Sequence, residues 1–365
     1  MHSLATQIDI VQRECSHPHR GDCPVRESQR RPTIADVARK AGVSKTTVSR
    51  FLSDQAEYIS EETYRKIEQA IQALHYEPSQ MARGLKAKQS RLIGILVADI
   101  ANPFTTAILR GAEDVCHRHH YSLLVCNSDN DPIKEQNYIR TLRSHHIDGL
   151  ILHTTGANQS VLLALQKEKT PVVLLDREVA GMHVDLVGMD NAQATYDALN
   201  YLVCQGYNSI AYVTAPTADI STRMERVQAF QSFMADRKLQ HTSIVFQIEG
   251  KASALPDFLT TFMEREDAHA KAIFTGNAVI LLQVALAMQQ LGYRVPDDVA
   301  LISFDDPDWA QIVGITTVSQ SAYEMGVLAA ERLVARLGGD AGDPQRLYVT
   351  ATLQERDSTP KVAKG

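Results

Sequence analysis

The sequence contains no long hydrophobic run. None of its apolar stretches reaches the roughly 18 residues that a membrane-spanning helix needs, and the first thirty residues lack the apolar segment of a secretory signal. These absences predict a cytoplasmic protein without a membrane partner. Cysteine is scarce, with five widely scattered residues: Cys15, Cys23, Cys116, Cys126 and Cys204. Without an export signal, we expect them to be reduced thiols.

Motifs of common enzymes are also missing. The sequence has no G-x-G-x-x-G after its first predicted strand, no P-loop lysine motif and no G-x-S-x-G elbow. The histidine clusters at 116–120 and 144–146 fall at predicted helix ends, where solvated histidines are favoured. A zinc site is possible by residue type in the N-terminal segment, at Cys15, His17, His19 and Cys23, but no fold pattern surrounds these residues. We therefore expect no enzyme, no cofactor and no metal.

Charge is divided unevenly along the 365 residues, a length that suggests two or three domains. Residues 31–91 carry a net charge of +4, residues 1–30 carry none, and the remainder carries -10. A small basic segment joined to an acidic body indicates that only this segment meets a polyanion. Residues 1–31 are predicted to be a disordered extension. Alternatively, they begin at an upstream start codon that the cell does not use, in which case they are not made.

Residues 33–42, TIADVARKAG, predict a short amphipathic helix that ends at a glycine. Thr33 can cap its N-terminus, and Asp36 three residues later completes a capping-box pattern. Four apolar residues share one face: Ile34, Val37, Ala38 and Ala41. Gly42 ends the helix because glycine accepts the left-handed conformation.

Residues 43–53, VSKTTVSRFLS, predict a second helix, which completes a helix-turn-helix. Ser44 can cap it. Its apolar face holds Val48, Phe51 and Leu52, and its polar face holds Lys45, Thr46, Ser49 and Arg50. Short hydroxyls can bond phosphates, and arginine can bond both acceptors of guanine. A third helix follows, capped by Ser60. The alternative is a solvated bundle without a ligand, which the basic charge and polar face disfavour.

The segment 32–86, PTIADVARKAGVSKTTVSRFLS…ISEETYRKIEQAIQALHYEPSQMARGLK, resembles the headpiece of LacI/GalR-type transcriptional regulators. The resemblance extends to about Asp357. It implies base-reading roles for Lys45, Thr46 and Arg50. It also implies that four hydroxyl residues contact or orient toward phosphates: Thr33, Ser44, Thr47 and Ser49. The implied partners are a pseudo-palindromic double-stranded DNA operator and a second copy of the chain.

Residues 76–88, YEPSQMARGLKAK, predict a hinge helix, since Pro78 suits a first helical turn. In the resembled family this helix folds on DNA and its leucine wedges into the minor groove. Leu85 matches that leucine, and Ala82 lies on the same side. Such a wedge unstacks a base step and bends the duplex. The alternative is a plain linker.

The body alternates short apolar runs with helical segments. The runs LIGILVA, YSLLVC, DGLILH and PVVLLD form one series, and SIAYVT, SIVFQI, AIFTG and VALISF form a second. This alternation predicts two α/β lobes with buried parallel strands. The fold class is therefore an all-α headpiece with a hinge helix, followed by a two-lobed body. A ligand is expected between the lobes, at the carboxyl ends of the strands.

The body resembles type I periplasmic sugar-binding proteins, and this resemblance implies crossovers near 187–191, 315–320 and 338–344. It places ten residues in an effector cleft: Asn102, Phe104, Ser128, Asp129, Asp176, Arg177, Arg223, Asn277, Asp305 and Gln320. Arg223 matches the family's inducer-binding arginine, whereas Ala278 replaces a usual aspartate. Each residue also has a structural alternative. Asp176 or Asp305 could cap a helix, and Arg223 could be a surface charge.

The predicted domains follow from these elements. They are an extension at 1–31, a headpiece at 32–77, a hinge and linker at 78–91, an N-terminal lobe at 92–189 plus 318–342, a C-terminal lobe at 190–317 plus 343–357, and a tail at 358–365. The chain's last residues show no apolar heptad, so we expect a homodimer and no larger assembly.

The predicted function is a cytoplasmic repressor that binds operator DNA under the control of a sugar or sugar acid. Residues 97–104 and 128–156 resemble the branch of the family that responds to ketogluconate and ketodeoxygluconate, so a 2-ketogluconate-like acid is the first candidate effector. Three alternatives stay open: a regulator responding to a neutral sugar or purine, a soluble sugar-binding protein, and a sugar-modifying enzyme.

Overall fold

The computed structural model describes residues 32–52, 59–76, 89–168, 170–218, 220–239, 242–248, 254–265 and 270–362. The predicted extension and the hinge helix, with Ala82 and Leu85, lie outside these ranges. Contacts divide the chain into two units, Met1–Arg83 and Gly84–Gly365, which are described in turn. Within the described ranges, no helix combines the length and the apolar character needed to cross a membrane.

The first unit contains the predicted helix-turn-helix. Its helices are α1 (Ile34–Ala41), α2 (Lys45–Phe51) and α3 (Glu61–Leu74). Six buried side chains form its core: Val37, Ala38, Ala41, Val48, Ile67 and Ala70. The headpiece therefore has a hydrophobic core of its own.

The helix ends are stabilised as the sequence predicts. The Asp36 carboxylate accepts a hydrogen bond from the backbone N–H of Thr33 at 2.9 Å. Gly42 follows α1 with a φ of 68°, a left-handed conformation that glycine adopts without strain. Ser44 accepts from the N–H of Thr47 at 3.1 Å. These bonds satisfy backbone donors that the first turns leave unpaired.

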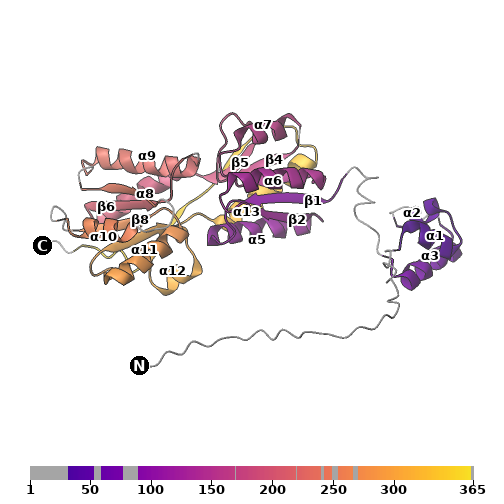
Figure 1. The fold of residues 1–365 in the computed structure, drawn as a ribbon, viewed down its shortest axis with the longest axis horizontal. Coiled ribbons are helices and arrows are strands. Elements are labelled where there is room, and N and C mark those ends of the chain that lie inside the picture. The colour runs from indigo at the N-terminus through magenta and orange to yellow at the C-terminus, as the bar shows by residue number, and fades with distance from the viewer. Residues whose placement is uncertain are drawn as a thin grey trace, which may run out of the picture. The chain divides into compact units, whose positions relative to one another are not determined.

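The second unit holds two lobes, each built on one sheet with helices packed against it (Figure 1). The first sheet is parallel, with strands in the order β11 (Arg346–Val349), β5 (Asp185–Met189), β4 (Val172–Leu175), β3 (Gly149–Leu152), β1 (Leu92–Val97) and β2 (Ser122–Asn127). Its helices are α5 (Pro103–Arg118), α6 (Pro132–Ser144), α7 (Gln159–Lys167) and α13 (Ala322–Leu337).

The second sheet has the order β12 (Thr352–Gln354), β10 (Thr316–Ser319), β9 (Ala300–Phe304), β8 (Lys271–Thr275), β6 (Ser209–Thr214) and β7 (Ile244–Gln247). β12 is antiparallel to β10, and the other pairs are parallel. The helices of this lobe are α8 (Asn191–Gln205), α9 (Ser221–Asp236), α10 (Leu255–Met263), α11 (Ala278–Leu291) and α12 (Asp308–Ile312). The prediction of two α/β lobes is confirmed.

Burial explains the apolar runs of the sequence. In β1, Ile93, Ile95, Leu96 and Val97 are all fully buried. Parallel strands that are covered on both faces need apolar residues at consecutive positions. All eight predicted runs form strands, namely β1–β4 and β6–β9.

Three crossovers join the lobes in the described part of the chain, and one lies away from its predicted position. The chain passes from β5 to α8 and from β10 to α13, near the two predicted segments. The third crossover was predicted at 338–344. However, β11 pairs with β5 in the first sheet and β12 pairs with β10 in the second. The crossing therefore falls between Val349 and Thr352, and the predicted C-terminal-lobe segment 343–357 is divided between the lobes.

The residues after β12 also differ from the predicted tail at 358–365. Ser358 and Thr359 are buried. The Ser358 hydroxyl accepts from the N–H of Thr316 at 2.8 Å, and the Thr359 hydroxyl lies 2.9 Å from the Tyr201 hydroxyl. These residues are therefore part of the second lobe.

A pair of glycines lets α5 and α13 approach closely. A Cβ on Gly111 would lie 2.1 Å from the carbonyl oxygen of Tyr323, and a Cβ on Gly326 would lie 2.1 Å from that of Ile108. Both distances are far below contact distance, so only glycine fits at either position. This contact fixes the returning crossover helix against the first lobe.

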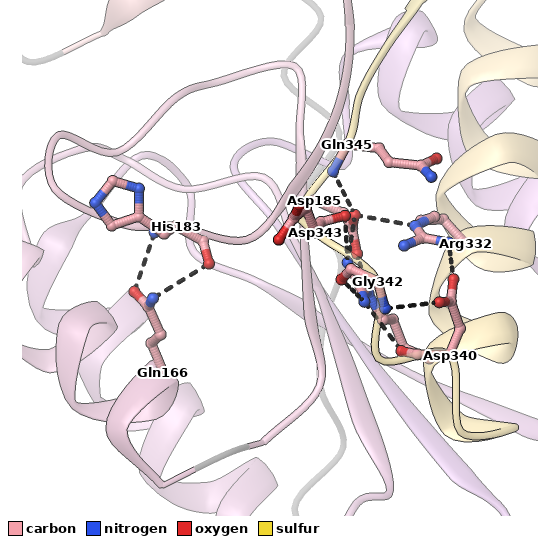
Figure 2. Close-up of polar contacts among 9 residues, drawn as sticks. Gln166, His183, Asp185, Arg332, Asp340, Gly342, Asp343 and Gln345 are labelled. Carbon is pink, nitrogen blue, oxygen red and sulfur yellow. Dashed lines mark hydrogen bonds and ion pairs between the residues drawn. The ribbon is translucent and has the colours of Figure 1, made fainter.

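A buried carboxylate fixes the other end of α13 (Figure 2). Asp185 accepts from Arg336 Nε at 2.7 Å and from the N–H of Gln345 at 2.8 Å, and it lies 2.9 Å from Arg332 Nε. Arg332 also pairs with Asp340. Burial alone would raise the pKa of Asp185, but these hydrogen bonds outweigh it and lower the pKa below its usual value. Asp185 is therefore ionised at neutral pH and ties α13 to the strands β5 and β11.

The start of the body is anchored by a second carboxylate. Asp148 accepts from the N–H and the hydroxyl of Ser90, at 2.7 and 2.8 Å, and from the N–H of Arg91 at 2.9 Å. The Arg91 guanidinium lies 5.1 Å from the ring centroid of Tyr121. The chain that arrives from the headpiece is therefore attached to the first lobe at Ser90.

Candidate functional site

The polar face of α2 is presented to solvent. Lys45, Thr46 and Arg50 are exposed, whereas Val48 is fully buried in the headpiece core. Phe51 packs on Tyr64 of α3 with 4.6 Å between ring centroids. The helix therefore holds its apolar side against α1 and α3 and directs the three predicted base-reading residues outward.

The four hydroxyl residues predicted near phosphates are more constrained. Thr33 donates its hydroxyl to Asp36 at 2.7 Å, and the hydroxyls of Ser44 and Thr47 lie 2.8 Å apart. Ser49 is half-buried. Thr33, Ser44 and Thr47 thus have structural hydrogen bonds, and their phosphate contacts stay predictions. The predicted wedge, Leu85 with Ala82, lies outside the described residues.

Four of the ten predicted cleft residues make local structural contacts. Asn102 caps α5 by accepting from the N–H of Phe104 at 3.0 Å, and Asn277 caps α11 by accepting from the N–H of Ile280 at 2.9 Å. The buried Ser128 donates to the carbonyl of Val97 at 3.2 Å. Asp129 is exposed and pairs with Lys134. Their direct effector contacts stay untested.

The carboxyl ends of β3 and β4 bring three ionisable groups together. The side chains of His153 and Asp176 are 5% and 8% exposed, with 3.5 Å between Nε2 and Oδ2. Arg177 is buried too and donates Nη1 to the carbonyl of Thr154 at 2.7 Å. Phe104 meets the His153 ring edge-on, at a centroid distance of 6.3 Å. These contacts form the wall of the first lobe.

The electrostatics of this wall are set by burial and by arginines of both lobes. Burial, with repulsion from Arg223, lowers the pKa of Arg177 to about 10. Burial opposes ionisation of Asp176, yet His153, Arg226 and Arg177 hold its pKa below its usual value. At neutral pH, Arg177 is therefore cationic and Asp176 anionic. Arg223 of the second lobe thus acts on Arg177, and Asp176 of the first lobe acts on Arg223, so charged groups of both lobes influence one another.

The second lobe contributes Arg226, which the sequence analysis did not single out. Its guanidinium donates to Asn191 Oδ1 at 2.7 Å, to the carbonyl of Gly276 at 2.9 Å and to Gln320 Oε1 at 2.8 Å. It also lies 3.9 Å from the ring centroid of Phe304. Asn191 begins α8 and Gln320 follows β10, so Arg226 connects two crossovers.

Arg223 lies less deeply than Arg226. It is half-buried and donates to the carbonyl of Pro216 at 2.8 Å. Burial and repulsion from Arg226 lower its pKa below the usual value. The two arginines are three residues apart and therefore share one face of α9, which is the signal that could have identified Arg226 in the sequence.

Asp305 and Gln320 lie together in the second lobe, where they directly follow β9 and β10. Asp305 accepts from the N–H of Ala278 at 3.0 Å and from Gln320 Nε2. Burial raises the pKa of Asp305 above its usual value. Phe104, Asp305 and Gln320 line an inter-lobe cavity of about 370 Å³, a volume that suits a small ligand. Arg177 and Arg223 lie outside this lining.

Several buried polar atoms of the two lobes have no hydrogen-bond partner in the part of the chain that the structure describes. Among the described residues, no hydrogen-bond partner exists for either ring nitrogen of His153, for Asp176 Oδ1, for Arg177 Nε or for the Tyr212 hydroxyl. Such atoms are costly to bury and are normally satisfied by water or a ligand. The structure therefore brings Phe104, Asp176, Arg177, Arg223, Asp305 and Gln320 into one region, and adds His153 and Arg226.

Known proteins match both units. Residues 33–79 match the family described as bacterial regulatory proteins, lacI family, and residues 199–359 match the periplasmic binding protein-like domain. The HTH-type transcriptional regulator KdgR of Bacillus subtilis (strain 168) is 40% identical over 329 residues, which cover 89% of this chain and 97% of that protein. The HTH-type transcriptional regulator PtxS of Pseudomonas putida is 42% identical over 340 residues, covering 93% and 98%.

A solved structure agrees with this assignment. The lac repressor dimer bound to operator and the anti-inducer ONPF has a TM-score of 0.75 and 25% identity to this chain, covering 91% of this chain and 100% of that one. The exposed polar face of α2, the two lobes and these matches along nearly the whole chain agree. The chain therefore belongs to the LacI family of bacterial regulatory proteins, and it is a DNA-binding transcriptional regulator rather than an enzyme.

Proposed function

We propose that this regulator is a cytoplasmic, homodimeric repressor whose effector is a small hydroxylated acid, with 2-ketogluconate as the first candidate. Two headpieces related by a two-fold axis bind a pseudo-palindromic operator through α2. The acid binds between the lobes and changes operator affinity. An effector shifts this equilibrium only through its different affinities for the two states of the protein.

One observation carries the choice of an acid. Among the described residues, Arg177, Arg223 and Arg226 donate to carbonyl and amide oxygens, and no carboxylate forms an ion pair with any of them. The carboxylates around them, which are Asp176, Asp305, Glu135 and Glu225, act on these arginines without forming ion pairs with them. Charge-assisted hydrogen bonds from arginines to a carboxylate are strong and directional. A neutral sugar or a purine offers these guanidinium groups no carboxylate partner.

The remaining polar groups suit the hydroxyls of such an acid. Asp176 and Asp305 supply acceptors, and Gln320 supplies both a donor and an acceptor. The cavity beside Asp305 and Gln320 is large enough for a six-carbon acid. The relatives named PtxS and KdgR are regulators of the same family, and the match to each covers most of both chains.

The homodimer is supported by exposed apolar side chains on α11 and at the end of α12. Leu282 and Leu286 are about half exposed, and Ile312 and Val313 are 84% and 60% exposed. Apolar residues that gather on one surface are typical of protein interfaces. The lac repressor in the compared structure is also a dimer on its operator.

Calorimetry tests the effector directly. The full chain should bind 2-ketogluconate more tightly than gluconate, and should not bind ribose, glucose or guanine. Arg223→Ala should lose 2-ketogluconate binding and keep operator binding, whereas Arg294→Ala, a surface control, should keep both. Tight binding of a neutral sugar or of guanine, with no acid bound, would overturn the proposal.

Operator titrations test the regulatory step. Fluorescence anisotropy of labelled operator should show that saturating 2-ketogluconate lowers the affinity of the wild-type protein and leaves Arg223→Ala unaffected. A higher operator affinity with effector would make the protein a co-repressed regulator, and an unchanged affinity would exclude 2-ketogluconate as its effector.

A further inference from the structure

We infer that His153 distinguishes anionic from neutral effectors, and that it takes up a proton from solvent when the carboxylate of an effector binds. This inference rests on the proposed function, because it requires a sugar acid in the cleft. Protonation forms one N–H bond on the ring, and the proton comes from the buffer.

The position of His153 suits this role. It directly follows β3 inside the first lobe's wall and is 4% exposed. Among the described residues neither ring nitrogen forms a hydrogen bond, although Nε2 lies 3.5 Å from Asp176 Oδ2. Phe104 covers it from α5, so the ring is shielded from bulk water. A buried imidazole with two unsatisfied nitrogens responds strongly to any charge placed beside it.

The charges around His153 keep it neutral before an effector binds. Asp176 and Arg177 face it from the end of β4, and Arg223 acts on it from α9 in the other lobe. Burial, followed by the positive charge of Arg177, lowers the pKa of His153 below its usual value, against the attraction of Asp176. A protonated ring here would be repelled by Arg177 and Arg223, and the attraction of Asp176 does not outweigh this repulsion and the burial.

A bound carboxylate reverses this balance. It neutralises part of the charge of Arg177 and Arg223, which removes the repulsion that disfavours the imidazolium. The imidazolium has two N–H donors. One can donate to Asp176, 3.5 Å away, and the other to the effector. A neutral sugar supplies no such charge, so the ring stays neutral.

The loop that follows His153 is held in place by Glu135 on α6, another acidic group next to this loop. Glu135 is fully buried and accepts from the Thr154 hydroxyl at 3.1 Å, from the N–H of Thr155 at 2.6 Å and from Asn158 Nδ2 at 3.0 Å. Its oxygens bond these residues and not the imidazole. Glu135 therefore fixes the loop that begins at His153 and leaves Asp176 as the carboxylate beside the ring.

The sign of the pH effect follows from proton uptake. The complex holds more protons than the free protein, so acid effectors bind more tightly at lower pH. Between the two titration ranges, affinity should fall about tenfold per pH unit as the pH rises. Binding of any neutral sugar should show no such slope.

Calorimetry of the full chain with 2-ketogluconate at pH 7, in phosphate and in Tris, measures the protons taken up. Wild type should take up a proton, at most one per site. His153→Gln and His153→Asn should bind with none taken up, and with an affinity that does not change between pH 6 and 8. His183→Gln, an exposed histidine in the same lobe, is the matched control and should behave as wild type.

Two further measurements separate the possible outcomes. Imidazole NMR of the wild type should show the His153 ring neutral without effector and doubly protonated with it. Uptake that persists in His153→Gln and disappears in Asp305→Asn would assign the proton to Asp305 and overturn the inference. Binding of 2-ketogluconate without proton uptake would also overturn it and leave the proposed function standing, whereas no binding of any acid would refute the proposed function itself.

Discussion

Replacing Asp185 with asparagine should destabilise the body without touching either binding surface. Asp185 is 2% exposed, accepts hydrogen bonds from Arg336 and from one backbone N–H, and forms an ion pair with Arg332. Removing one partner of a fully buried ion pair costs roughly 3–5 kcal/mol. Arg332 keeps Asp340, Arg336 keeps three backbone carbonyls and asparagine keeps one acceptor oxygen, so we expect a loss of about 2–3 kcal/mol.

Urea unfolding of the full chain measures this loss. Far-UV circular dichroism follows the whole protein, whereas Trp309, the single tryptophan, follows the second lobe. A shift seen by both probes means that the lobes unfold together, and a shift seen only by circular dichroism means that the first lobe unfolds independently. Glu178→Gln is the control, since the Glu178–Arg346 ion pair is solvent-exposed and such pairs contribute about 0–1 kcal/mol.

The loss should also depend on pH. The folded-state pKa of Asp185 is lowered, so its stabilisation is complete above the unfolded pKa, near ~3.9, and disappears as the pH falls through the folded value. Wild type and Asp185→Asn should therefore differ most at neutral pH and converge in acid. If Asp185→Asn loses no more stability than Glu178→Gln at pH 7, the carboxylate does not hold α13 as described.

Three further substitutions test other parts of the molecule. Arg50→Ala should abolish discrimination between operator and random DNA in anisotropy titrations, because a bidentate guanine contact is worth roughly 1–3 kcal/mol; retained discrimination would mean that α2 is oriented differently. Leu85→Gly should reduce operator bending measured by FRET without unfolding the body, and an unchanged bend would make 78–86 a plain linker. Gly326→Ala should lower the melting temperature of the body, because a Cβ there meets the carbonyl oxygen of Ile108; an unchanged value would mean that α5 and α13 separate easily.

The fold was predictable where sequence signals are local. The caps at Thr33, Ser44 and Ser60 depend on residues three positions away. β11 was missed because it is an edge strand that reads RLYV, with Arg346 and Tyr348 exposed. No continuous apolar run marks such a strand, so the third crossover was predicted too early.

The candidate site was predictable only in part, because burial depends on distant contacts. Arg226 is separated by 94 residues from its partner Gln320, and sequence alone does not reveal which arginine of α9 lies deeper. His153 directly follows a buried strand, and the rule that ligands bind at strand ends could have identified it. Glu135 lies in the polar segment PIKEQNYIRTLRS, and nothing local indicates that a loop twenty residues later buries it.

The attachment at Ser90 makes the two halves of this regulator exchangeable. Asp148 binds two backbone N–H groups, which any residue except proline provides, together with the hydroxyl of Ser90. The bonds therefore depend little on the sequence that precedes Ser90, and the headpiece has a separate core. A hybrid protein joined just before Ser90, with the DNA-reading half of another family member, retains every described contact of the body. Such hybrids would place a chosen promoter under the effector of this protein.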